Sequence, residues 1–291
     1  MLARLAVAFA VIAMLSLPAQ ARRVALVIGQ NAYPGGGAAR VGLPKLDNPT
    51  PDARSVATLL AEHGFDVISC DGKEAGCFDL NRAGFLDALG KLETQAHGAD
   101  LALVYFAGHG VATEEGNIVA PTDARVNCQT GAVTLGVPVE RMLAATAPAA
   151  SKFVILDACR DNPLGMICPN LRGKTLSFTR IEAGPMQGLL LVTSTQFGQA
   201  ALDGVPGTHS PFATALLTAF EANPAVYFEQ VMNEVARATH EAAQNQYGFL
   251  QIPGKVVGGA AAPIGRSRSP TSWHSLRAAH SRSSGFVQSS N

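Results

Sequence analysis

Residues 101–110 read LALVYFAGHG, and this stretch decides the fold class. Its first six residues form a continuous apolar run of strand length, and Gly108, His109 and Gly110 follow directly. Similar short apolar runs occur at 24–28, 153–156 and 189–192, and FDVI at 65–68 is a further candidate strand. Helical patterns separate most of these segments. Continuous apolar strands that alternate with helices are typical of a mostly parallel sheet covered on both faces. The sequence therefore predicts an α/β three-layer sandwich in one domain.

The helices are predicted from caps, breakers and apolar spacing. One begins near Asn48-Pro49 and ends at Gly64, and its apolar side chains share one face. A second is expected to start with Asp79 as its N-terminal cap and to end near Gly98. Two more are expected at roughly 212–222 and 226–243.

The two ends of the chain have different compositions from its centre. Residues 1–21 contain Arg4, a short apolar run and Ala19-Gln20-Ala21, a pattern typical of a secretory signal peptide cleaved after Ala21. Residues 258–291 begin with small residues and continue rich in Ser and Arg, which predicts a disordered tail. The folded domain is thus expected at 22–257, exported to the periplasm or the cell exterior and without a membrane anchor after cleavage.

Overall charge and composition exclude one class of partner. The 22 basic residues balance the 22 acidic ones, and only 15% of the residues are charged. A nucleic-acid binder held by a basic field needs a positive excess. We therefore expect no nucleic-acid partner.

Two reactive side chains are predicted at one edge of the sheet. His109 follows the strand at 101–106, and Cys159 follows the strand at 153–156. Ligands and catalytic groups gather beyond the carboxyl ends of parallel strands, so these residues are expected to come from neighbouring strands. A thiol near a histidine is a candidate nucleophile. The other six histidines, His209 among them, are interpreted as solvated or structural.

The order and spacing of several segments resemble the caspase-like cysteine peptidase domain, in its bacterial metacaspase-like branch. His109 precedes Cys159 by about fifty residues, a separation typical of caspases. The similarity covers residues 23 to 253. It is carried by 24–29, LDNPTPDA at 46–53, YFAGHG at 105–110, LDACRDNP at 156–163, and the segments 194–204 and 209–212.

This resemblance implies a cysteine endopeptidase that acts on peptides or proteins. Cys159 would attack the scissile carbonyl, His109 would transfer protons, and the amides of Gly110 and Cys159 would stabilise the oxyanion. Asp52 and Asp157 would select a cationic side chain, so cleavage is expected after Arg or Lys. No third side chain that orients His109 is assigned.

The resemblance also implies a monomer without an obligatory cofactor. Calcium activates part of the family, but the candidate acids Glu114, Glu115, Asp123 and Asp161 are scattered, so no obligatory metal is expected and calcium activation stays an open alternative. The main alternative is a catalytically silent caspase-like module that binds a peptide or serves as a scaffold. The segments fit another kind of Cys–His enzyme, an amidase or a transferase, less specifically. A redox protein is not favoured, because the sequence contains no Cys-x-x-Cys motif.

The odd number of cysteines fits this interpretation. If Cys159 stays free as the nucleophile, four of the five cysteines remain for two bridges. Cys70 and Cys77 flank a short loop, which favours their pairing. Cys128 and Cys168 would then pair by elimination. An exported protein can keep such disulfides in an oxidising compartment.

Overall fold

The computed structural model describes residues 21–35, 40–113, 116–159, 168, 181, 186–196, 199, 201–222 and 228–258. These residues form a three-layer α/β sandwich whose central sheet is mostly parallel, as the sequence predicts. The predicted signal peptide, except Ala21, and the tail from 259 onward lie outside the described residues. Within the described part of the chain no helix has the length and apolar character to cross a membrane.

The central sheet is built on the apolar runs of the sequence. Its strands lie in the order β12-β11-β10-β5-β1-β3, with β4 also paired to β1. β12 is antiparallel to β11, whereas the other pairs in this order are parallel. The strands are β1 (Arg23–Gly29), β3 (Asp66–Val67), β4 (Cys77–Phe78), β5 (Leu101–Thr113), β10 (Ser151–Cys159), β11 (Leu189–Thr193) and β12 (Gly254–Gly258).

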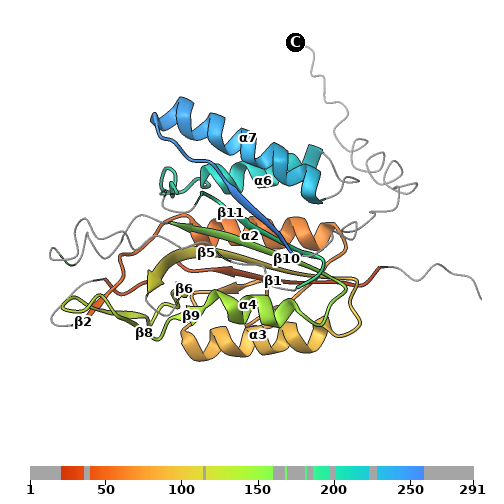
Figure 1. Cartoon of the computed structure of the whole chain (residues 1–291), viewed down its shortest axis with the longest axis horizontal. Coiled ribbons are helices and arrows are strands. Elements are labelled where there is room, and N and C mark those ends of the chain that lie inside the picture. The colour runs from red at the N-terminus through yellow and green to blue at the C-terminus, as the bar shows by residue number, and fades with distance from the viewer. Residues whose placement is uncertain are drawn as a thin grey trace, which may run out of the picture.

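Helices cover both faces of this sheet (Figure 1). On one face α2 (Pro49–Glu62), α6 (Pro211–Ala222) and α7 (Phe228–Tyr247) pack on Tyr105, Phe153 and their neighbours. On the other face α3 (Arg82–Ala96) and α4 (Val139–Thr146) pack on Phe106 and Val154. The alternation of side chains along each strand explains why a continuous apolar run is needed, since both faces of these strands are buried.

Short strands without an apolar run extend the fold beyond the predicted elements. β6 (Gly116–Val119) pairs with the end of β5 and with β9 (Val137–Pro138). A separate small sheet contains β2 (Arg40–Gly42), β7 (Arg125–Asn127) and β8 (Val133–Thr134). Because strands of two to four residues have no periodicity to detect, the sequence did not indicate them.

Two sequence expectations near the site are wrong. β5 continues to Thr113 and β10 to Cys159, so His109 and Cys159 lie within their strands and not after them. Pairing with β10 reaches His109, and pairing with β6 continues β5 beyond it. Asp79 does not cap α3, since Asn81 does so by accepting a hydrogen bond from the amide of Gly84. Asp79 instead accepts bonds from the amides of Asn31 and Ala32, which ties the chain after β4 to the chain after β1.

Candidate active site

The sheet register brings His109 and Cys159 together. β5 and β10 are neighbouring parallel strands, and His109 is the register partner of Cys159, the last residue of β10. Paired strands of a sheet lie about 4.8 Å apart. The expectation that the two residues come from neighbouring strands is therefore confirmed at the level of the backbone.

Hydrogen bonding fixes the state of the His109 ring. Its Nε2–H donates to the backbone carbonyl of Pro44 at 2.8 Å, so Nδ1 is the bare nitrogen of the neutral ring. Nδ1 is buried and has no hydrogen-bond partner among the described side chains. Burial lowers the pKa of His109 to about 4, against a smaller opposing effect of the Pro44 carbonyl. The ring is thus neutral at pH 7, with Nδ1 free to accept a proton.

Tyr33 holds His109 from a second side. Its hydroxyl accepts a hydrogen bond from the backbone N–H of His109 at 3.1 Å and donates one to the carbonyl of Ala120 at 2.9 Å. The two rings also lie in contact, with centroids 4.6 Å apart. Gly108 makes this approach fit, because a Cβ there would lie 2.8 Å from the Tyr33 hydroxyl and the residue has φ +155°.

Neither partner of His109 was found from the sequence. The Pro44 carbonyl is a backbone group in a loop, and a backbone acceptor leaves no residue-type signal. Tyr33 follows β1 by four residues, where a tyrosine is interpreted most simply as a surface or core residue. Both contacts depend on where the loops after β1 fold over the sheet edge.

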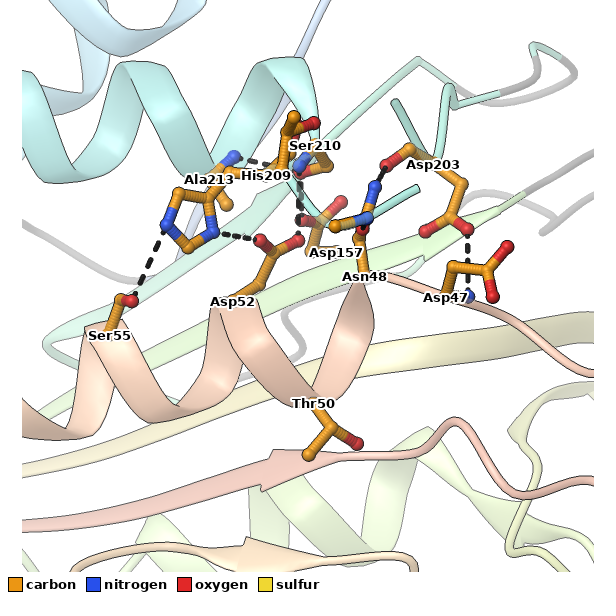
Figure 2. Close-up of polar contacts among 12 residues, drawn as sticks. Asp47, Asn48, Thr50, Asp52, Ser55, Asp157, Asp203, His209, Ser210 and Ala213 are labelled. Atoms are coloured by element: carbon orange, nitrogen blue, oxygen red, sulfur yellow. Dashed lines mark hydrogen bonds and ion pairs between the residues drawn. The ribbon is translucent and has the colours of Figure 1, made fainter. Parts of the chain in front are cut away.

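Asp52 and Asp157 lie close to one another, as expected for a shared pocket. Asp52 is in the first turns of α2, and Asp157 is on β10 two residues before Cys159. Both residues are buried, with 1% and 8% of their surface exposed. Figure 2 shows the two carboxylates converging on Ser210 at the start of α6.

Ser210 links the two acids. Its backbone N–H donates to Asp52 Oδ2 at 3.3 Å, and its hydroxyl donates to Asp157 Oδ2 at 2.8 Å. The same hydroxyl accepts the amide hydrogen of Ala213, as an N-cap side chain does. Tyr105 donates a further bond to Asp157 at 3.3 Å. The positive end of α6 thus faces both carboxylates, which favours negative charge there.

Burial nevertheless makes ionisation of this acid pair costly. Desolvation raises the pKa of Asp52 to about 7, with the charge of Asp203 adding to it. Desolvation, followed by the charge of Asp52, raises the pKa of Asp157 to about 7. The hydrogen bonds from Ser210 lower both values but do not offset burial. A cation placed beside the pair would favour its ionised form.

His209, interpreted from the sequence as solvated or structural, contacts one of the two acids. It is not simply solvated, because its Nδ1 lies 2.6 Å from Asp52 Oδ1 and its Nε2 lies 3.5 Å from Ser55 Oγ. The Ser55 hydroxyl, the His209 imidazole and the Asp52 carboxylate thus form a chain of contacts like the one in a serine hydrolase. Ser55, however, lies in the middle of α2, where helix bonding occupies its amide and leaves no amide at that residue for an oxyanion.

Asn48 places His209 and Ser210 against α2. Its side-chain amide donates to the carbonyls of Asp203 and Val205, and its Oδ1 accepts the amide hydrogen of Gly207. The side chain at the start of α2 therefore binds a loop that follows some 155 residues later. A sequence pattern for a helix start does not reveal such a partner.

The remaining predicted site residues have the following places. Gly110 is buried on β5 opposite Val119 of β6. Disulfides join Cys70 to Cys77 and Cys128 to Cys168. Asp123 accepts the amide hydrogen of Arg82, whereas Glu114, Glu115 and Asp161 lie outside the described residues. No three His, Cys, Asp or Glu side chains of the described ranges are grouped as a metal site.

The fold is an α/β sandwich in which His109 and Cys159 lie on neighbouring strands, and comparison gives the family. The family model of the caspase domain matches residues 22–258, so the chain belongs to the caspase-domain family. A crystal structure of protein GSU0716 from Geobacter sulfurreducens is similar, with a TM-score of 0.56 and 17% identity, over 84% of this chain and 98% of that one. At this identity the likeness concerns the fold. None of the curated proteins matches the sequence.

Proposed function

We propose that this protein is an exported cysteine endopeptidase that cleaves after Arg or Lys. Membership of the caspase-domain family supports a cysteine peptidase. The register of β5 and β10 carries the proposal further, because it sets Cys159 beside a histidine that is neutral and oriented.

The chemistry follows from the state of the His109 ring. Nδ1 takes the proton of the Cys159 thiol as sulfur attacks the scissile carbonyl carbon. The amides of Gly110 and Cys159 are the proposed donors to the oxyanion. The C–N bond breaks, the protonated ring gives its proton to the leaving amine, and water then hydrolyses the thioester. Because burial disfavours the charged ring, the proton moves during attack and no stable imidazolium is expected beforehand.

The buried acid pair supports the choice of a cationic side chain. Asp157 lies two residues before Cys159 on β10, and Asp52 lies close to Asp157. The burial of both acids raises the energy of the ionised pair. A guanidinium or ammonium group would relieve this cost by charge-assisted hydrogen bonds. An uncharged or anionic side chain would leave it unrelieved, which disfavours cleavage after Asp.

Export, a monomeric state and independence of metal ions belong to the same proposal. The signal-like residues 1–21 support export, and the two disulfides fit an oxidising compartment. Comparing activity before and after a chelator tests metal dependence, and gel filtration tests the oligomeric state.

A matched set of fluorogenic peptides tests the proposed activity. We expect hydrolysis when the residue before the scissile bond is Arg or Lys, and little when it is Asp or citrulline, the uncharged analogue of Arg. Cys159→Ala should abolish turnover and also labelling by an electrophilic Arg peptide. Absence of labelling in the unmodified protein would favour the alternative of a silent peptide-binding module, and preference for Asp would contradict the assigned pocket.

A further inference from the structure

We infer that His209 is a specificity-determining residue, which keeps Asp52 ionised and so sets the pH range in which the pocket accepts a cationic side chain. The inference rests on the proposed function, since it concerns the same acid pair. His209 acts through Asp52 and is therefore a positioning residue, without contact to the reacting atoms.

The contact between the two residues is short and leaves Asp52 fully engaged. His209 Nδ1 lies 2.6 Å from Asp52 Oδ1, and the amide of Ser210 donates to Oδ2. Only 2% of the Asp52 side chain is exposed, so water cannot stabilise its charge. A protonated imidazole at this distance can stabilise the ionised carboxylate.

The opposite edge of the imidazole faces solvent. The His209 side chain is 34% exposed, and it lines a groove of about 540 Å³ between α2 and α6. Ser55, whose hydroxyl lies 3.5 Å from Nε2, lines the same groove. Protons can therefore exchange between bulk water and the part-exposed imidazole while Asp52 itself stays buried. The imidazole therefore lies between the groove and the buried carboxylate of Asp52.

The charged and titratable groups around this contact come from several elements. Asp157 on β10 and Tyr105 on β5 bond one another beside Asp52, and Asp203 in the loop before α6 adds negative charge. In the groove, the charged side chains are Arg54, Glu62 and Glu221. Arg54 is bonded to Glu74, so its charge is already matched.

Counting charges shows why the imidazole matters. With His209 protonated and both Asp52 and Asp157 ionised, the three groups carry one net negative charge, which one guanidinium balances. Without a proton on His209, two buried carboxylates share the pocket, and proton uptake by one of them becomes favourable. Protonation of the pair would remove the attraction for Arg and Lys.

The test compares pH profiles of kcat/KM for peptides with Arg or citrulline before the scissile bond. In His209→Gln, which keeps a hydrogen-bond donor but not the charge, the acid limb for the Arg peptide should move up by about one pH unit or more. Near pH 6.5 this should cost roughly tenfold in kcat/KM, mainly through KM, and the profile for citrulline should not shift. His209→Lys, with a permanent charge, should move the limb down.

The exposed His97 provides a control, and His97→Gln should leave both profiles unchanged. An acid limb that is the same in His209→Gln as in the unmodified protein would overturn the inference. A protein that does not cleave after Arg or Lys at any pH would instead overturn the proposed function.

A second measurement does not depend on activity. Carboxyl-carbon NMR of the folded full chain follows the Asp52 titration directly, and its midpoint should rise in His209→Gln. If that variant does not fold, His209→Lys takes its place, and the midpoint of Asp52 should then fall. An Asp52 midpoint that neither substitution moves would contradict the inference.

Discussion

Replacing Asp157 by Asn should stabilise the protein at alkaline pH while it impairs cleavage after Arg. Burial raises the pKa of Asp157 from 3.8 to about 7, so the folded chain holds this proton more tightly than the unfolded chain. The favourable contribution is complete below about pH 4 and is lost as the pH rises through 7. At about 1.4 kcal/mol per pKa unit, the ionised carboxylate costs up to about 4 kcal/mol at pH 8.

Asparagine removes that cost and retains much of the local bonding. Its side-chain oxygen can accept the hydroxyl hydrogens of Ser210 and Tyr105 as Asp157 Oδ2 does. We therefore expect the Asn variant to be about 2 to 4 kcal/mol more stable at pH 8 and nearly equal only below about pH 4. For a chain of this size each kcal/mol raises Tm by about 2 to 4 °C.

Urea unfolding at several pH values measures this effect. Both chains should carry Cys159→Ala, so that self-cleavage cannot distort the curves. The difference between the chains cancels other groups, such as His109, whose lowered pKa acts in the opposite direction. Asp66→Asn on the exposed edge of β3 serves as the control and should show no such trend. A stability difference that does not grow between pH 5 and 8, or a less stable Asn variant at pH 8, would refute the reasoning.

Three further outcomes are expected. Tyr33→Phe leaves the His109 amide and the Ala120 carbonyl without their buried partner. The free energy of unfolding should fall by about 1 to 3 kcal/mol, and kcat should change more than KM. The control Tyr247→Phe, at an exposed site, should change neither. The acid limb of kcat/KM for an Arg peptide should lie near pH 7, set by the acid pair, whereas a limb near pH 4 would assign it to His109. Thiol titration of the unreduced, unfolded chain should find one free thiol, and three or more would contradict the two disulfides.

Much of the site was predictable because it lies on strands with strong apolar patterns. The apolar runs at 101–106 and 153–156 predicted β5 and β10. The positions of His109 and Cys159 at the ends of these runs then indicated two neighbouring strands whose carboxyl ends meet at one edge of the sheet. The boundaries were less accurate. β5 is longer than its apolar run, because the antiparallel partner β6 completes its hydrogen bonding from a segment of only four residues.

The contacts that tune the site were not predictable in the same way. Asp79 precedes an apolar helical pattern and looks like a cap, yet its carboxylate bonds amides that follow β1. His209 lies in a loop between apolar segments, and its bond to Asp52 spans 157 residues of chain. A local sequence pattern can indicate only contacts between residues close together in the chain. The partners of Asp79 and His209 are distant in the chain, so no local pattern predicts them.

The amino-acid sequence by itself determined the α/β class, and it indicated two candidate catalytic residues and two candidate specificity acids. Apolar periodicity and motif spacing are properties of the chain, so they need no coordinates. Tertiary structure alone decided the protonation and the contacts of His109 and of the two acids. Burial sets the pKa of His109 and of both acids, while the Pro44 carbonyl, Tyr33, His209 and Ser210 reach them only once distant loops pack over the sheet edge.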